Sequence, residues 1–148
     1  MYRQREGLEV LLVHLGGPFW AKKDLGAWFL PKGEVEAGED LLEAARREFE
    51  EETALRATGP FTELGAVVQK SGKTVHAWAF RGDCDPASIR SNTFTMEWPP
   101  RSARRVEFPE VDRARFFSVE DALGHIHPAE GELVARLQRL WTEGRLPP

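Results

Sequence analysis

The sequence predicts a layered fold that combines α-helices with β-strands. One segment has the spacing of an amphipathic helix, and several short segments rich in β-branched and aromatic residues have the pattern of strands. The chain has 148 residues, of which 41% are apolar and 30% are charged with both signs interspersed. This balance is typical of a compact domain with one core, so residues 1–148 are interpreted as a single domain of the α/β class.

A buried strand is the first predicted element. Residues 8–14 are mostly apolar, and the Gly16-Gly17-Pro18 turn ends them. A loop then runs to about Gly38, and an amphipathic helix is predicted over residues 40–53. This helix contains neither proline nor glycine, and its apolar residues recur at helical spacing. They are Leu41, Leu42, Ala45 and Phe49.

The second half of the chain predicts a hairpin, a late strand and two helices. Residues 64–70 and 74–80 flank the Ser71-Gly72-Lys73 turn, and their β-branched and aromatic content favours an antiparallel hairpin. Residues 82–110 are rich in Pro, Ser, Arg and Asp and are predicted to be irregular connections. The last elements are a strand over residues 114–117, a short helix that Ser118 caps, and a helix over residues 130–143.

Charge and cysteine content exclude several classes of protein. A net charge of −4 argues against a broad surface for nucleic-acid binding, so no stable nucleic-acid partner is expected. Arg101, Arg104 and Arg105 form the one local exception. No apolar run is long enough to cross a membrane, and the polar amino terminus lacks a signal-type segment, so we expect a cytoplasmic protein. Cys84 is alone and cannot form an intrachain disulfide.

Four carboxylates crowd the carboxyl end of the predicted helix. Glu48, Glu50, Glu51 and Glu52 lie where the helix dipole is already negative, and like charges three or four residues apart repel each other. Glu52 falls at the edge of the buried stripe, where a carboxylate needs a cation or strong donors. A divalent metal supplies that compensation, because Mg²⁺ takes oxygen ligands and shares them with phosphates. A solvated acidic face is the alternative, and it explains Glu50 better than Glu52.

A glycine-containing loop precedes this helix. Gly33 and Gly38 permit tight turns and a close approach of the backbone to a ligand. Lys32 adds a compact positive charge that suits a phosphate group. The loop and the helix together favour a phosphate site beside a metal, and an ordinary connection between two elements is the alternative.

The loop and helix resemble the signature of the Nudix hydrolases. That signature is a glycine, five residues, Glu, seven residues, and then Arg-Glu-apolar-any-Glu-Glu-any-Gly-apolar. The matching segment comprises Gly33, Glu39, Arg47, Glu48, Phe49, Glu51, Glu52, Thr53, Ala54 and Leu55. Only Ala54 departs, at a position where glycine ends the helix with positive φ. We expect alanine to be tolerated there, at a cost of about 1 kcal/mol if that conformation is kept.

The resemblance covers most of the chain and implies a fold and a reaction. The implied fold is an α/β/α sandwich around a mixed sheet. Its usual first strand has only Met1 to Arg3 available here, so that strand is either shortened or begins upstream. The implied reaction is the cleavage by water of a diphosphate linkage in a nucleoside diphosphate joined to a group X. Family members are often homodimers, although no interface is indicated here.

The resemblance also implies roles for individual residues. Glu48, Glu51 and Glu52 correspond to ligands of Mg²⁺ or Mn²⁺, and the Gly33 carbonyl is a further ligand. The remaining pair of the signature, Glu39 and Arg47, corresponds to a structural ion pair that holds the loop to the helix.

The general base is left open between two kinds of glutamate. The family uses either a glutamate of the signature, here Glu51 or Glu52, or one from a later loop. Glu110 is the first later candidate, because it precedes the predicted late strand, and Glu107 and Glu97 follow it.

Four further residues are predicted to contact substrate. Lys32 and Arg101 are candidates for phosphate groups, with a solubilising loop as the alternative for Arg101. Trp28 and Phe29 precede the Lys32-Gly33 loop and are candidates for stacking on a nucleobase, with the core as the alternative.

Three functions compete for this sequence. The Leu30-Pro31-Lys32-Gly33 segment with Val35-Glu36 resembles the loop of Nudix members that act on dinucleoside polyphosphates, which favours that substrate class. A pyrophosphohydrolase that removes oxidised nucleoside triphosphates is the alternative, because the tyrosine that the polyphosphate branch carries after the signature is missing. A nucleotide-binding module without hydrolysis is the alternative of another class.

Overall fold

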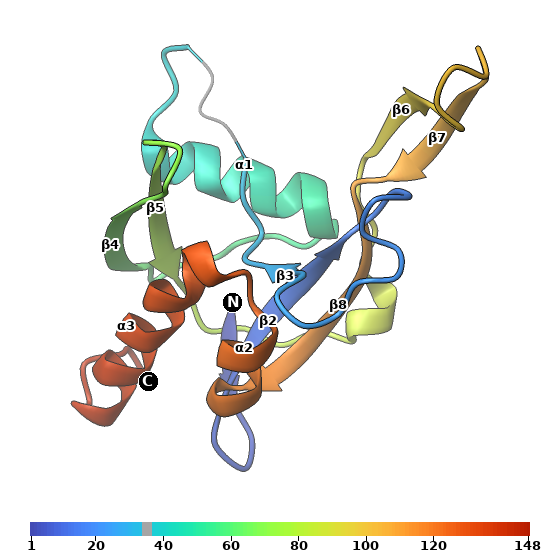
Figure 1. Cartoon of the computed structure of the whole chain (residues 1–148). Helices are drawn as coiled ribbons and strands as arrows, with labels where there is room; N and C mark the ends of the chain where they lie inside the picture. The colour runs from blue at the N-terminus through green and yellow to red at the C-terminus, as the bar shows by residue number, and fades with distance from the viewer. Residues whose placement is uncertain (34–36) are drawn as a thin grey trace.

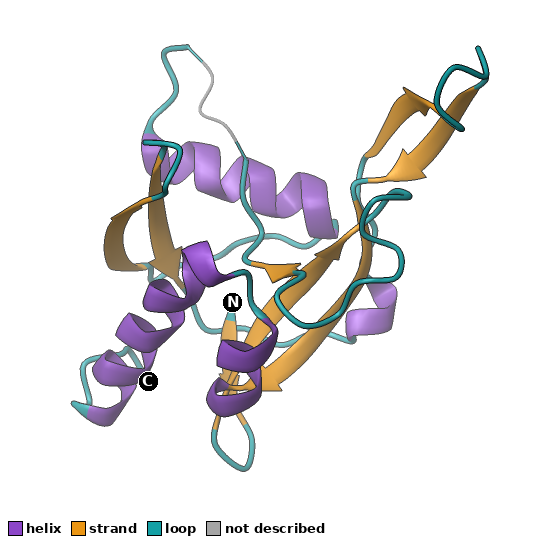
Figure 2. Cartoon of the chain, viewed as in Figure 1, coloured by secondary structure: helices purple, strands orange, loops and turns teal. Residues whose placement is uncertain are grey.

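The structure is a computed structural model that describes residues 1–33 and 37–148. Figure 1 shows the arrangement of its elements, and Figure 2 separates helices from strands by colour. The strands are β1 (Tyr2–Gln4), β2 (Leu8–Leu15), β3 (Trp28–Phe29), β4 (Thr62–Val68), β5 (Thr74–Ala79), β6 (Thr93–Glu97), β7 (Arg105–Pro109) and β8 (Val111–Ser118). The helices are α1 (Leu41–Thr53), α2 (Val119–His125) and α3 (Gly131–Thr142), with 3₁₀ turns at Pro86–Ser88 and Pro128–Glu130.

Strand β2 is the centre of the main sheet. It pairs antiparallel with β8 along one edge, and with β1 and then β3 along the other. A parallel bridge between Tyr2 and Arg81 joins β1 to the chain that follows the β4–β5 hairpin, which makes the arrangement mixed. This central position explains why β2 is almost entirely apolar, since both of its faces are covered.

Helices cover both faces of this sheet. Because side chains of a strand alternate between faces, Leu11 packs with Phe49 of α1, whereas Leu12 lies in the cluster that contains Ala122 of α2 and Leu137 of α3. Figure 1 shows α1 on one side of the sheet and the other two helices on the opposite side. The α/β/α sandwich implied by the resemblance is therefore confirmed.

Most predicted elements are present with small changes at their ends. The helix predicted over residues 40–53 is α1, and the Asp40 side chain caps it by accepting the Glu43 N–H. The Ser118 side chain caps α2 in the same way. The predicted hairpin is β4 and β5, and the strand predicted over residues 114–117 is the longer β8. Strand β3 was not predicted, because two residues carry no periodic pattern.

The prediction that residues 82–110 form only irregular connections is wrong. Strands β6 and β7 form an antiparallel hairpin there, and we call residues 93–109 the arm. Figure 1 shows the arm extending away from the rest of the domain. Its strands alternate exposed polar and half-buried apolar residues, whereas the prolines that suggested a loop lie at the turn and at the end of β7.

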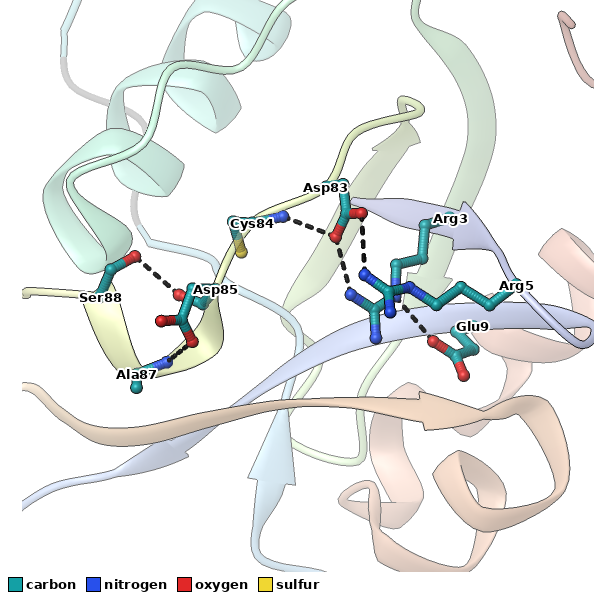
Figure 3. Close-up of polar contacts among 8 residues, drawn as sticks. All are labelled: Arg3, Arg5, Glu9, Asp83, Cys84, Asp85, Ala87 and Ser88. Carbon is teal, nitrogen blue, oxygen red and sulfur yellow. Dashed lines mark hydrogen bonds and ion pairs between the residues drawn. The ribbon is translucent and has the colours of Figure 1, made fainter.

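Strand β1 is short and is held by neighbours on both sides. The Tyr2 N–H donates to the Phe80 carbonyl at 3.0 Å, and the Gly82 N–H donates to the Tyr2 carbonyl at 2.9 Å. Figure 3 shows Arg3 and Arg5 meeting at the carboxylate of Asp83. A strand of three residues is therefore fixed by main-chain hydrogen bonds and ion pairs. No helix among the described residues is long and apolar enough to cross a membrane.

Candidate active site

The carboxyl end of α1 presents Glu48, Glu51 and Glu52, which we call the glutamate cluster. The helix ends at Ala54, which has φ of 62° and ψ of 15° and whose N–H donates to the Glu50 carbonyl at 2.8 Å. This conformation is left-handed and favours glycine. Alanine therefore keeps the geometry of the signature glycine, as expected.

Arg47 is the cation that joins the glutamate cluster to the preceding loop. Its Nε and Nη2 atoms donate to the two carboxylate oxygens of Glu39 at 2.7 and 3.0 Å, which is a bidentate pair. Its Nη1 atom donates to Glu48 at 2.9 Å and to Glu51 at 3.2 Å. One guanidinium thus fastens the loop to the helix and also lies between two carboxylates of the cluster.

The loop backbone lies directly against the cluster at Gly33. A Cβ atom at this position would overlap the carboxylate of Glu48, so glycine allows the observed approach without displacing that side chain. The neighbouring Lys32 N–H donates to Oε2 of Glu52 at 3.0 Å. The loop and the carboxyl end of α1 therefore meet at one place, as the signature implies.

Burial raises the pKa values of two residues of the glutamate cluster. Burial raises the pKa of Glu52 to about 8, although the Lys32 N–H and ammonium act in the opposite direction. Burial also raises the pKa of Glu48, and the hydrogen bond from Arg47 opposes that increase. Two carboxylates are thus held where their charged forms are unfavourable unless a further cation binds nearby.

Of the later glutamates, Glu110 lies near the cluster. Its N–H donates to the Asn92 carbonyl at 2.9 Å, and its charge contributes to the raised pKa of two cluster carboxylates. Glu107 is exposed on β7 opposite Thr95, and Glu97 is exposed at the far end of β6. The structure therefore brings Glu110 to the site and leaves Glu107 and Glu97 on the arm.

The structure adds Glu130 to the residues that shape this loop. Its carboxylate is fully buried; Oε1 accepts the Leu30 N–H at 2.9 Å, and Oε2 faces the Lys32 ammonium at 3.0 Å as an ion pair. The ammonium also lies 4.4 Å from the centre of the Phe29 ring. The charge of Lys32, predicted to bind phosphate, is therefore shared with an internal partner. No local pattern in the sequence predicts this pair, because nearly 100 residues separate its members.

The donor set fits a divalent cation by its chemistry. Three carboxylates and a backbone carbonyl are the hard oxygen ligands that Mg²⁺ and Mn²⁺ take, and the backbone of Gly33 lies against the Glu48 carboxylate. Among residues 1–33 and 37–148, no three His, Cys, Asp or Glu side chains already converge as a metal site. In this arrangement the Nη1 atom of Arg47 lies between the carboxylates of Glu48 and Glu51 and donates to both.

An apolar cavity opens beside this donor set, with a volume of about 360 Å³. Gly33 and Glu52 lie on its wall together with Leu42, Trp78 and Leu137. A cavity of this size suits a nucleoside-sized group. The site thus combines a charged end with an apolar chamber.

Trp28 and Phe29 do not line this cavity. They are 2% and 7% exposed, and the ring of Phe117 packs against Trp28 while the ring of His127 stacks on Phe29. The indole N–H of Trp28 donates to Asp24 at 2.9 Å. The prediction that these rings stack on a nucleobase is therefore wrong, because neighbouring side chains cover both rings.

Two other predictions fall elsewhere. Arg101 lies in the turn of the arm, at the opposite end from its attachment to the domain. The resemblance of Val35-Glu36 to the loop of one Nudix branch lies outside the described residues.

Comparison with known proteins connects this geometry to a family. Residues 1–137 match the family model described as the NUDIX domain. The chain belongs to the Nudix family. The Nudix signature and the fold around it are therefore features of the same domain, rather than a chance match of a short motif.

One curated Nudix relative matches part of the chain. It is an RNA pyrophosphohydrolase of Erythrobacter litoralis, 44% identical over 61 residues. That segment is 38% of this chain and 36% of the relative, so the match spans only about a third of the relative's length.

Solved structures with the Nudix fold match nearly the whole chain. A Caenorhabditis elegans Ap4A hydrolase binary complex superposes with a TM-score of 0.64 at 23% identity, covering 96% of this chain and 93% of that one. The NUDIX domain of Shewanella oneidensis NrtR complexed with ADP ribose gives a TM-score of 0.65 at 17% identity, with 95% and 82% covered. At these identities the likeness establishes the shared fold.

Proposed function

We propose that this Nudix domain is a metal-dependent pyrophosphohydrolase that cleaves a diphosphate linkage in a nucleotide. The observation that carries the proposal is the glutamate cluster packed against Gly33, where burial raises the pKa of Glu52 to about 8. A protein gains nothing in stability from such a carboxylate, but a cation site requires it in charged form. Glu48, Glu51, Glu52 and the Gly33 carbonyl would hold Mg²⁺ or Mn²⁺.

In this proposal different residues bind the metal, position its ligands and accept the proton of the attacking water. When bound, the metal would neutralise phosphate charge and lower the pKa of a water. Arg47 keeps the carboxylates in place through its pair with Glu39, and it would release its Nη1 contacts when a stronger cation arrives. Glu52 or Glu110 would accept the proton of the attacking water, because both lie at the cluster whereas Glu107 is exposed on the arm.

A dinucleoside polyphosphate is the first proposed substrate. The Leu30-Pro31-Lys32-Gly33 loop supports it through its resemblance to that branch, and the cavity beside Gly33 has room for one nucleoside. The fold is shared with a protein described as an Ap4A hydrolase.

The 5′ end of RNA is the second proposed substrate. It is supported by the 61-residue match to an RNA pyrophosphohydrolase, in which the linkage cleaved is of the same chemical kind. Removal of oxidised nucleoside triphosphates and binding without hydrolysis remain the other two alternatives.

A product-resolved substrate screen tests the proposal. The protein is incubated with Mg²⁺, with Mn²⁺ or with a chelator, and with nucleoside triphosphates (normal and oxidised), dinucleoside polyphosphates, 5′-triphosphorylated RNA and nucleotide sugars. We expect cleavage of a P–O–P linkage in at least one class of substrate, and we expect it only when Mg²⁺ or Mn²⁺ is present. Binding of nucleotides without turnover in every class would contradict the proposal and favour a binding module.

A further inference from the structure

The arm carries three exposed arginines, and Glu97 lies opposite one of them, Arg105, in the register of the hairpin. Arg101, Arg104 and Arg105 are exposed, and none of them forms an ion pair with the part of the chain that the structure describes. Among the exposed arginines elsewhere, Arg139 and Arg145 each pair with a glutamate, whereas Arg56, Arg81, Arg90 and Arg115 form no ion pair with a described carboxylate. The tip therefore offers an unused set of guanidinium groups within five residues.

The turn at the tip is closed by its own hydrogen bonds. The Trp98 N–H donates to the Arg104 carbonyl at 2.9 Å, and the Ser102 N–H donates to the Pro99 carbonyl at 3.2 Å. The Arg104 N–H donates to the Ser102 hydroxyl at 3.2 Å. The guanidinium groups thus extend from an ordered turn, which lowers the entropy lost when they bind a ligand.

Aromatic side chains lie next to these arginines. Trp98 at the end of β6 packs edge-on against Phe19, with ring centres 5.7 Å apart, and Phe19 is 61% exposed. Phe94 and Phe108 are paired across the two strands of the arm and are partly buried. The exposed ring of Phe19, which contacts the arm through Trp98, and the exposed guanidinium groups are the two kinds of group with which proteins bind single-stranded nucleic acid.

The base of the arm adjoins the glutamate cluster. The Asn92 N–H, one residue before β6, donates to the Glu51 carbonyl at 3.0 Å, and Glu110 follows directly after β7. A strand of five residues spans about 17 Å. The tip of the arm therefore lies at a distance from the cluster that a mononucleotide does not cover but a chain of several nucleotides does.

We propose that the arm binds the sugar-phosphate chain of a single-stranded RNA whose 5′-terminal phosphates lie at the glutamate cluster. This proposal rests on the proposed function and selects the second of its two substrates. The three arginines contact backbone phosphates, and Phe19 offers a face on which a base stacks. The negative net charge of the chain agrees with a small local site rather than a broad nucleic-acid surface.

The test compares substrates of different length. The triple variant Arg101→Gln, Arg104→Gln, Arg105→Gln is assayed with 5′-triphosphorylated oligoribonucleotides of two and of ten nucleotides. Its KM for the ten-nucleotide substrate should rise about tenfold more than its KM for the dinucleotide, because only the longer chain reaches the tip. The slope of log KM against log salt should fall by about 2, since each phosphate contact on a single strand contributes about 0.7.

A matched control removes the same charge elsewhere. Arg5→Gln, Arg139→Gln, Arg145→Gln changes three exposed arginines outside the arm and should leave the length dependence and the salt slope as in the wild type. Melting temperatures verify that both triple variants are folded. Fluorescence anisotropy with the ten-nucleotide RNA in the presence of a chelator gives the same comparison without turnover.

The outcomes separate this proposal from the proposed function. Equal length dependence in the wild type and the arm variant, with RNA cleaved by both, would overturn the role of the arm and leave the hydrolase intact. Absence of cleavage with every substrate would overturn the proposed function, and the anisotropy comparison would still decide the role of the arm. A wild-type dimer that the arm substitutions convert to a monomer would also overturn it, because the arm would then be an interface between copies.

Discussion

The glutamate cluster and the arm differ in how the protein treats their charges. Glu48 of the cluster is 15% exposed, and it is held by a hydrogen bond from Arg47 and by close packing on Gly33. The arginines of the arm are exposed and have no ion-pair partner among the described residues. Charges of the first kind are fixed by contacts within the domain, whereas charges of the second kind are exposed to solvent without an ion-pair partner among the described residues.

The two regions therefore suit different tasks, namely positioning a reacting phosphate and contacting a distant part of a long substrate. A reacting phosphate requires ligands held to within a fraction of an ångström, and the hydrogen bonds and packing around α1 supply that order. A long substrate requires contacts at a distance that tolerate many sequences, and flexible exposed guanidiniums serve that purpose. Substitutions that weaken one region at a time should therefore leave the function of the other region intact.

The largest expected effect follows from Glu52→Gln. The change keeps the size of the side chain and removes a charge that the proposed metal site needs, so activity should fall by about 10³-fold. Without metal, the same variant should melt at a higher temperature than the wild type, because burial raises the pKa of Glu52 to about 8. Activity assays and thermal melts with and without Mg²⁺ measure both effects.

Glu50→Gln is the matched control for this prediction. Glu50 is exposed on the same helix, so neither activity nor the stabilisation by Mg²⁺ should change by more than about twofold. If Glu52→Gln were more stable than the wild type at every Mg²⁺ concentration, the cluster would be an acidic surface rather than a cation site.

The second prediction concerns the pair of Lys32 and Glu130. Lys32→Met leaves the fully buried Glu130 carboxylate without its cation, so the free energy of unfolding should fall by about 2–3 kcal/mol. Lys32→Met, Glu130→Gln removes both charges, keeps an amide oxygen that can accept the Leu30 N–H, and should recover most of that stability. Urea unfolding of the two single variants and the double variant measures the coupling.

The kinetics of the double variant decide what Lys32 does. If Lys32 only fixes the loop through Glu130, the double variant should regain the wild-type KM together with the stability. A KM that stays raised in the stable double variant would show that the ammonium also contacts phosphate, which is the role predicted from the sequence.

The glutamate cluster could be predicted from the sequence because its parts are close together in the chain. The signature from Gly33 to Leu55 fixes residue types at set spacings, and a helix converts those spacings into one face. The left-handed conformation at Ala54 could be predicted for the same reason.

The arm and the Glu130 pair could not be predicted in this way. Proline, serine and arginine near residue 100 suggested a loop, although the alternating Thr93-Phe94-Thr95-Met96 pattern is typical of a strand. The partner of Lys32 depends on how α3 packs against the sheet, which no local pattern contains. The same holds for Trp28 and Phe29, whose burial follows from neighbours far away in the chain.

The third prediction is a pH dependence of the metal-free protein. The pKa of Glu52 is raised from 4.5 to about 8 by burial, so the folded state binds more protons than the unfolded state between these values. The resulting stability is fully present below pH 4.5 and is lost as the pH rises through 8. From pH 5 to 8 we expect a decrease of about 1–2 kcal/mol after allowing for solvent screening.

Chemical denaturation at several pH values in a chelator tests this slope. Glu52→Gln should remove most of the decrease, because glutamine does not titrate and only the smaller contribution of Glu48 is left, whereas changes at the exposed arginines of the arm should leave the decrease in place. A wild-type protein that is equally stable at pH 5 and pH 8 would show that the Glu52 carboxylate is well solvated, and the contrast between the two regions would weaken.

The smallest effect is expected where α1 ends, at Ala54. Its φ of 62° strains an alanine but not a glycine, so Ala54→Gly should raise the free energy of unfolding by about 0.5–1 kcal/mol. Because the backbone already has the conformation that glycine favours, the glutamate cluster should not move, and kcat should stay within about twofold. The variant therefore separates the stability of the helix end from its chemistry. A gain in stability with a large change in kcat would mean that the strain at this residue positions Glu51 and Glu52, and the cluster would then be less rigidly fixed than its contacts indicate.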